Sequence, residues 1–191
     1  MIKVCIADNY PVVHFGVKSY FKDNAEISIV ANVGNFLMVR DILQTKEIDV
    51  LILDLELEGL SSIFEVKALL KNFPKTKIII FSGLSEQIYA PNAIKAGVSG
   101  FVHKSEKLET LGQSIIKVHQ GKIIMNETVK KNLALIAKQS KSERLYRKLS
   151  NREVEVLRYL SDGKKNHEIA DILKLNEKTI STYKLRLLTK L

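Results

Sequence analysis

The sequence predicts an α/β domain with a doubly wound parallel sheet, followed by a small all-helical domain. Three observations lead to this fold class. Short apolar runs alternate regularly with longer amphipathic segments over residues 1–120. The apolar runs show no polar alternation, which is typical of strands buried on both faces. Positive charge is concentrated at the other end of the chain, where capped helical segments follow one another.

Five apolar runs rich in Val and Ile are too short for helices and are expected as strands: Ile2–Ala7, Ile27–Val33, Val50–Leu53, Ile78–Phe81 and Gly100–Val102. The segments between and after them have helical periodicity: Val12–Phe21, Phe36–Gln44, Ile63–Asn72, Gln87–Lys95 and Leu108–His119. A fivefold alternation of strand and helix specifies a doubly wound, flavodoxin-like domain with a five-stranded parallel sheet.

Polar residues stand where the predicted strands end: Asp8 and Asn9, Asp54, Ser82, and Lys104. Ligands of such sheets bind outside the carboxyl ends of the strands. Each residue alone has an ordinary structural explanation, as a helix cap or a loop side chain. Together at one edge they suit phosphoryl transfer to a carboxylate, with Asp54 as nucleophile, Asp8 and a backbone carbonyl near Glu56 holding Mg²⁺, and Ser82 and Lys104 holding phosphoryl oxygens.

The stretches Ile6–Pro11, Leu51–Glu56, Ile80–Gly83 and Ala96–Lys104 resemble, in order, the signature segments of receiver domains. The resemblance covers residues 2 to about 120. It implies an aspartyl-phosphate at Asp54, a hydroxyl switch at Ser82 and an aromatic switch at Phe101.

One departure concerns the metal site. Receivers usually carry two acidic residues after the first strand, whereas this chain has Asp8 followed by Asn9. The loss of one negative charge should lower the affinity for Mg²⁺, whose expected ligand set is Asp8, Asn9, Asp54 and Glu56. Two alternatives stay open: a receiver phosphorylated at Asp54, and an atypical receiver that acts independently of phosphorylation.

The formal charge of +9 is unevenly distributed. Residues 1–125 contain 14 Lys and Arg against 13 Asp and Glu, whereas residues 126–191 contain 16 against 8. A basic domain beside a nearly neutral one is expected when only one of them meets a polyanion, since lysine and arginine release counterions from nucleic acid. An anionic membrane surface is the competing partner.

The predicted domains are residues 1–120, a linker over 121–148, and a helical domain over 149–191. Ser150 and Glu153 form a capping box at the start of the first helix, and Gly163 is its expected stop. Asn176 can cap the third helix, whose expected buried positions are Ile180, Tyr183, Leu187 and Leu191. Periodicity alone fits an ordinary three-helix bundle equally well, and the basic charge favours a DNA-binding helix-turn-helix.

The segments Leu149–Leu157, Asn166–Ala170 and Glu177–Lys184 resemble the LuxR-type output domain. With the receiver, they resemble regulators of the NarL/FixJ type, and Lys178–Lys184 is similar to the recognition helix of the BvgA group. The resemblance implies that Lys178, Thr179 and Lys184 contact DNA phosphates while Ser181 and Thr182 face base edges. The family usually continues into a fourth, dimerising helix; a truncated output domain and one lacking this helix are both open.

The resemblance implies a two-component transcription regulator with double-stranded promoter DNA, a sensor histidine kinase and a second copy of the chain as partners. An enzyme is not expected, because the position two residues after Asp54 is Glu56, where hydrolases with an aspartyl nucleophile favour a second Asp. No nucleotide-binding glycine motif occurs. Cys5, the single cysteine, is expected as a buried apolar residue. No apolar run approaches membrane-spanning length, and we expect a cytoplasmic protein.

Overall fold

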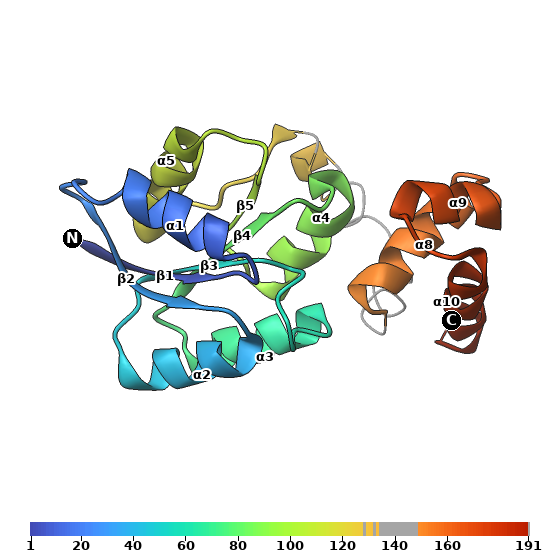
Figure 1. The fold of residues 1–191 in the computed structure, drawn as a ribbon, viewed down its shortest axis with the longest axis horizontal. Coiled ribbons are helices and arrows are strands. Elements are labelled where there is room, and N and C mark those ends of the chain that lie inside the picture. Colours follow the sequence, from blue (N-terminus) through green and yellow to red (C-terminus); the bar gives the residue numbers. More distant parts are fainter. Residues whose placement is uncertain (128, 132, 134–148, 191) are drawn as a thin grey trace. The chain divides into compact units, whose positions relative to one another are not determined.

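The computed structural model describes residues 1–127, 129–131, 133 and 149–190. The chain folds as two units, Met1–Lys130 and Lys131–Leu191. Figure 1 shows a sheet with its flanking helices in the first unit, and helices α8, α9 and α10 in the second.

The first unit is built on a five-stranded parallel sheet with the strand order β2-β1-β3-β4-β5. Its strands are β1 (Ile2–Ala7), β2 (Ile27–Val33), β3 (Val50–Leu53), β4 (Lys77–Ser82) and β5 (Gly100–His103). The first three have the predicted bounds, and the last two extend into polar residues because parallel pairing, not hydrophobicity, decides where a strand ends. Every residue of β3 is buried, as expected for a strand covered on both faces.

The helices are α1 (Pro11–Tyr20), α2 (Phe36–Thr45), α3 (Ile63–Asn72), α4 (Glu86–Ala96) and α5 (Leu108–His119). Figure 1 shows α1 and α5 on one side of the sheet and α2 and α3 on the other. The doubly wound fold class is therefore confirmed. Helix α1 starts one residue earlier than predicted, since proline at the first helical position loses no hydrogen bond.

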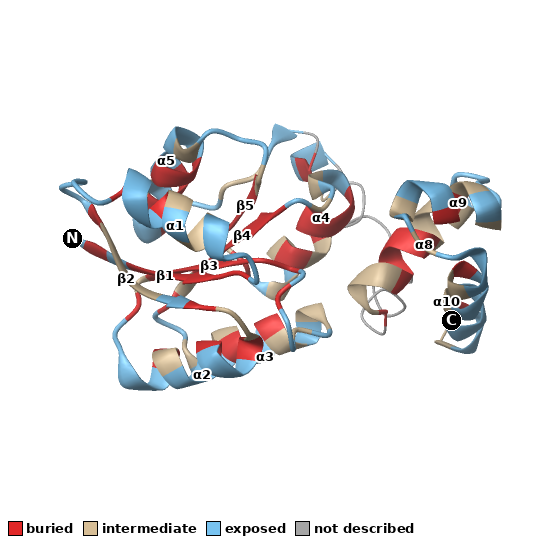
Figure 2. Cartoon of the chain, in the orientation of Figure 1, coloured by how far each residue is buried: buried red, intermediate tan, exposed pale blue. Residues whose placement is uncertain are grey.

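The core lies between these layers, where Figure 2 shows β1, β3 and β4 almost entirely buried, whereas the edge strand β2 is buried only at its two ends. One cluster joins β1, β3, β4 and the inner side of α5; its fully buried members include Ile6, Ile79, Leu111 and Ile115. Gly112 in α5 allows a close approach, because a Cβ there would lie 3.1 Å from Cε1 of Phe21. The core thereby fixes the sheet whose carboxyl edge carries the polar residues.

The chain continues along the first unit after α5, within the predicted linker. The amide of Ile124 donates to the carbonyl of Ser99 at 2.8 Å, and Ile124 forms an isolated parallel bridge with Gly100. A Cβ at Gly100 would lie 3.3 Å from Cβ of Ile124, so glycine permits this pairing. Residues 121–124 of the linker expected over 121–148 thus lie along the first unit, and residues 128, 132 and 134–148 of that linker lie outside the described residues.

The second unit contains α8 (Asn151–Ser161), α9 (Asn166–Leu173) and α10 (Glu177–Lys190). The predicted capping box is present: Ser150 Oγ accepts from the Glu153 amide at 3.3 Å, and Glu153 Oε2 accepts from the Ser150 amide at 2.7 Å. Gly163 follows α8 with a φ of +77°, as its role as a stop requires. In α10, Ile180 and Leu187 are buried and Tyr183 is half-buried, whereas Leu191 lies outside the described residues.

Cys5 is completely buried in β1, and burial raises the pKa of its thiol to about 12. Since the thiolate is the reactive form, we expect no measurable reaction of the folded protein with a thiol-specific disulfide reagent at pH 8. Unfolding in guanidinium chloride should restore full reactivity, which absorbance of the released thiol would report. Rapid labelling of the folded chain would contradict the buried position.

Candidate functional site

The predicted polar residues meet at the carboxyl edge of the sheet. Asp8 follows β1, Asp54 follows β3, Ser82 ends β4 and Lys104 follows β5. Backbone hydrogen bonds hold these strand ends in place: the Asp54 amide donates to the carbonyl of Ala7 at 2.9 Å, and the Lys104 amide donates to the carbonyl of Ser82 at 2.9 Å. The parallel register thus brings together side chains that are up to 96 positions apart.

Lys104 connects the two carboxylates. Its Nζ lies 2.7 Å from Oδ2 of Asp8 and 2.6 Å from Oδ2 of Asp54. Both carboxylates are almost completely buried, with exposed side-chain fractions of 2% and 1%. Burial alone would lower the pKa of Lys104, but the hydrogen bonds and charges of Asp54 and Asp8 outweigh burial and raise it. Lys104 is therefore a charged ammonium group at neutral pH.

The second oxygen of each carboxylate accepts a bond from the following loop. Oδ1 of Asp8 accepts from the Tyr10 amide at 2.8 Å, and Oδ1 of Asp54 accepts from the Glu56 amide at 3.3 Å. Each carboxylate is thus oriented from two sides. The nucleophile proposed from the sequence is presented at the edge of the sheet in a fixed orientation.

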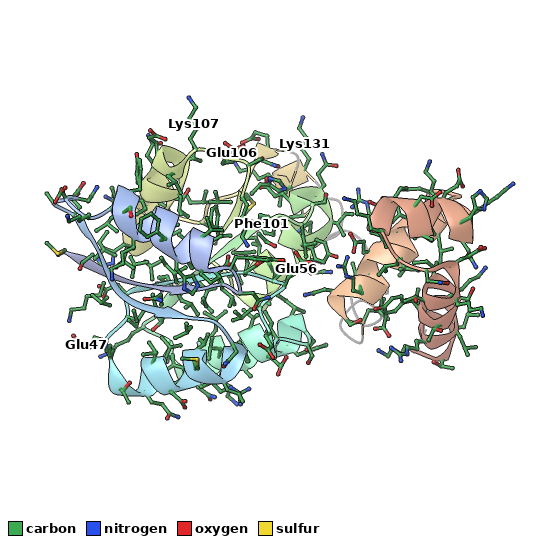
Figure 3. All side chains as sticks on the ribbon, viewed as in Figure 1. Glu47, Glu56, Phe101, Glu106, Lys107 and Lys131 are labelled. Carbon is green, nitrogen blue, oxygen red and sulfur yellow. The ribbon has the colours of Figure 1, made fainter. Side chains whose placement is uncertain are left out.

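Asn9 does not join the carboxylates. Its Nδ2 donates to the backbone carbonyl of Glu56 at 2.6 Å, and its Oδ1 accepts from the Glu58 amide at 2.8 Å. The side chain thus connects the loop after β1 to the loop after β3. Figure 3 shows Glu56 on that loop, at the edge of the first unit.

The residues present fit a magnesium site only in part. Asp8 and Asp54 offer the carboxylate oxygens that Mg²⁺ prefers, and the Glu56 carbonyl is a further oxygen donor. Asn9, however, turns an N–H group, which cannot be a metal ligand, toward that carbonyl. Among the described residues, no group of three or more His, Cys, Asp or Glu side chains is placed to hold a metal ion.

The two expected switch residues are both buried. Ser82 is 0% exposed, and its Oγ accepts a long hydrogen bond of 3.4 Å from the Leu84 amide. Phe101, in β5 beside Ile80 of β4, is 3% exposed and lies inside the unit (Figure 3). The Ser82 hydroxyl therefore lies at the edge of the sheet that carries the two carboxylates, and the Phe101 ring lies in the interior of the unit.

Three side chains near this edge were not predicted. The ring of Tyr10 lies 5.5 Å from Nζ of Lys104, within cation–π range. His14 Nε2 contacts the Asp8 carbonyl at 2.8 Å, and His103 bridges the Gly83 carbonyl at 3.1 Å and Ser105 Oγ at 2.6 Å. Tyr10 and His14 follow Asp8 closely in the sequence, and His103 directly precedes Lys104, so proximity to predicted site residues was the signal for all three.

The second candidate surface is α10. Lys178, Ser181, Thr182 and Lys184 are exposed, and Thr179 is half-buried. Asn176 accepts from the Lys178 amide at 2.9 Å through Oδ1, so it caps α10 as predicted. The helix therefore presents short polar and basic side chains along its exposed side, as a groove-binding helix does.

The two hydroxyls of α10 are already engaged within the helix. Ser181 Oγ donates to the Glu177 carbonyl at 3.1 Å, and Thr182 Oγ1 donates to the Lys178 carbonyl at 3.0 Å. Both oxygens keep acceptor capacity, so they suit donors on base edges better than acceptors.

Three further exposed side chains near or on this helix, two of them basic and one an imidazole, were not singled out from the sequence. Asn166 Nδ2 donates to Ser181 Oγ at 3.3 Å, which places the start of α9 beside α10. The neighbours of Asn166, namely Lys165 and His167, are exposed, as is Arg186 in α10. The basic composition of this part of the chain was their only signal. No helix among the described residues is long and apolar enough to cross a membrane.

Comparison with known proteins finds one family model for each unit of the chain. Residues 4–116 match the family described as "Response regulator receiver domain", and residues 147–191 match "Bacterial regulatory proteins, luxR family". The chain is 34% identical over 189 residues to the Fimbriae Z protein of Salmonella typhimurium, covering 98% of this chain and 89% of that protein.

The solved structures that resemble the chain over nearly its whole length include two complexes with DNA. One is RcsB from Salmonella enterica serovar Typhimurium bound to promoter rprA in the presence of the phosphomimetic BeF3⁻, with a TM-score of 0.62, 26% identity, and coverage of 100% of this chain and 92% of that one. The other contains two RcsB dimers bound to two parallel DNAs, with a TM-score of 0.62, 26% identity, and coverage of 99% and 91%.

Proposed function

Because this chain belongs to the response regulators, which here join a receiver domain to a LuxR-type DNA-binding domain as in the NarL/FixJ type, we propose that phosphorylation of Asp54 controls its binding to promoter DNA. The observation that carries this proposal is the position of Asp54: buried, oriented by Lys104 and the Glu56 amide, and placed beside Asp8. A sensor histidine kinase would supply the phosphoryl group.

In the transfer, a carboxylate oxygen of Asp54 attacks the phosphorus of a phosphohistidine. The new O–P bond forms as the P–N bond breaks, and the departing imidazole takes a proton from solvent. Lys104, already 2.6 Å from an Asp54 oxygen, would hold a phosphoryl oxygen, and the Ser82 hydroxyl would hold another. Movement of Ser82 toward the phosphoryl group would free space for Phe101 to change position.

Receiver domains generally bind Mg²⁺, which neutralises phosphoryl charge when bound. In this chain we propose Asp8, Asp54 and the Glu56 carbonyl as ligands, with affinity lowered by Asn9. The two carboxylates would hold the ion, and Lys104 would shift from between them toward the phosphoryl group.

For DNA binding, we propose that α10 enters the major groove. Lys178, Thr179 and Lys184 would contact phosphates, and Ser181 and Thr182 would face base edges. The internal bonds of both hydroxyls leave them weak readers of sequence, so DNA shape and phosphate positioning would carry much of the specificity. Lys165, His167 and Arg186 would add phosphate contacts.

Two copies would bind half-sites about one helical turn apart. The related RcsB structures, one with promoter DNA and a phosphate mimic and the other with dimers on DNA, support a phosphorylation-dependent dimer here. A protein that binds promoter DNA would act in the cytoplasm, where that DNA lies. The alternative is a receiver that regulates DNA binding without phosphorylation, and the bonding of Asn9 favours it over a fully typical receiver.

Mg²⁺ with beryllofluoride, which mimics the aspartyl-phosphate, tests the proposal. We expect the mixture to shift the chain from monomer to dimer in analytical ultracentrifugation and to tighten promoter binding. Asp54→Ala should abolish both responses, whereas Asp23→Ala, which removes an exposed acid at the opposite end of α1, should retain them. DNA binding that never responds to beryllofluoride would favour the phosphorylation-independent alternative.

A further inference from the structure

Asn9 uses both halves of its amide on one loop. Nδ2 donates to the Glu56 carbonyl at 2.6 Å while Oδ1 accepts from the Glu58 amide at 2.8 Å. The loop is also held from its other side, where the Glu58 carbonyl accepts from the Phe36 amide at 2.8 Å. Asn9 therefore fixes the segment that follows Asp54 to the segment that follows Asp8.

An amide can make this pair of bonds, whereas an ionised carboxylate cannot, because it only accepts. A carboxylate at position 9 could still accept from the Glu58 amide, but its other oxygen would face the Glu56 carbonyl oxygen. Two oxygens without a proton between them repel each other unless a cation separates them. The Nδ2–H group of Asn9 thus takes the place that a bound cation would fill between a carboxylate and this carbonyl.

The local charge supports the same conclusion. Lys104 lies within 2.7 Å of both buried carboxylates, so one cation already faces Asp8 and Asp54. A neutral residue at position 9 leaves the edge with two carboxylates and one ammonium group. A divalent ion binds more weakly where fewer carboxylates surround it.

We propose that Asn9 is a positioning residue that holds the loop after β3 without a metal ion, and that it thereby lowers the affinity of the chain for Mg²⁺. This inference deepens the metal site of the proposed function and rests on it. It concerns the unphosphorylated protein alone, so its test needs neither kinase nor DNA. Failure here would leave the role of Asp54 untouched.

The test compares the full chain with Asn9→Asp and Asn9→Ala. Calorimetric titration with Mg²⁺ measures affinity, and amide hydrogen exchange at Glu58, followed by NMR, measures how firmly the loop is held. We expect Asn9→Asp to bind Mg²⁺ at least about tenfold more tightly than the natural chain. Without metal, the Glu58 amide should exchange slowly in the natural chain and faster in both variants. Alanine removes the acceptor, and repulsion between the aspartate and the Glu56 carbonyl weakens the bond that the carboxylate could still accept.

Added Mg²⁺ should restore slow exchange in Asn9→Asp but not in Asn9→Ala, and should leave the natural chain unchanged. Asn24→Asp is the matched control, because Asn24 accepts from the Glu26 and Ile27 amides through Oδ1, which a carboxylate can replace. Asn24→Asp should change neither the affinity for Mg²⁺ nor the exchange rate of the Glu58 amide. Equal Mg²⁺ affinity of Asn9→Asp and the natural chain, or equal metal-free exchange in all variants, would overturn the proposal.

Discussion

Replacing Lys104 by methionine is expected to lower the free energy of unfolding of the first unit by about 3 kcal/mol at pH 7. The ammonium group is the partner that Asp8 and Asp54 share, and both carboxylates are almost fully buried. Without it, two like charges would face each other with little solvent to screen them. Hydrogen exchange of the β-strand amides would measure the stability of this unit by itself.

The pKa of Lys104 is raised, so its contribution should persist through the neutral range. A group whose pKa is higher in the folded state stabilises fully below its unfolded pKa and loses this effect only as the pH rises through the folded value. As the pH rises from neutral, the stability provided by Lys104 should therefore decline only in the strongly alkaline range.

Two further variants separate charge pairing from loss of packing. Lys107→Met removes an exposed lysine that extends away from the unit (Figure 3), and should change stability by less than about 0.5 kcal/mol. Adding Asp8→Asn to Lys104→Met should recover most of the loss, since only one buried charge remains. A Lys104→Met chain as stable as the natural one would show that the carboxylates do not depend on this cation.

The fold was largely predictable because its signals are local. A run such as Val50–Leu53 is too short for a helix and too apolar for an exposed strand, and the structure buries it completely. Capping chemistry is equally local, and the Ser150–Glu153 capping box is present as predicted. The pairing of Ile124 with Gly100 was not predictable, because it depends on a space that exists only after the sheet has formed.

The sequence predicted which residues form the candidate site but not the hydrogen bonds that they make. The positions of the strand ends alone predict that Asp8, Asp54, Ser82 and Lys104 lie together, because parallel strands share one carboxyl edge. The direction of the Asn9 amide was not encoded in any spacing. Its partners, the Glu56 carbonyl and the Glu58 amide, are backbone groups of a loop whose path depends on the whole domain.

In the second unit, replacing Lys190 by methionine is expected to lower the free energy of unfolding by about 2 kcal/mol. Lys190 Nζ lies 2.7 Å from both carboxylate oxygens of Glu153, whose side chain is 2% exposed, so the end of α10 is tied to the start of α8. The estimate is below that for Lys104 because the Lys190 side chain is 38% exposed and partly screened by water.

Acid should weaken the same link. Burial alone would raise the pKa of Glu153, but the bonds from Lys190 and Ser150 outweigh it and lower the pKa. A carboxyl with a lowered folded pKa stabilises above its unfolded value, and this effect is lost as the pH falls through the folded value. The melting temperature of the second unit should therefore fall as the pH drops below about 4.5. The fall should be less steep in Lys190→Met, which lacks the ion pair.

Lys184→Met is the matched control, since Lys184 is an exposed lysine of the same helix. The free energy of unfolding of this variant should stay within about 0.5 kcal/mol of that of the natural chain. Its DNA binding should be weaker, and the slope of log affinity against log salt concentration should fall by the amount expected for about one lost phosphate contact. Lys190→Met should lower stability but, at temperatures where it stays folded, should leave DNA affinity and its salt dependence unchanged. The reason is that Lys190 is engaged with Glu153 and not with a phosphate. Equal losses of stability in the two variants would mean that the ion pair does not hold α8 to α10, and equal losses of DNA affinity would mean that α10 does not present Lys184 to the backbone.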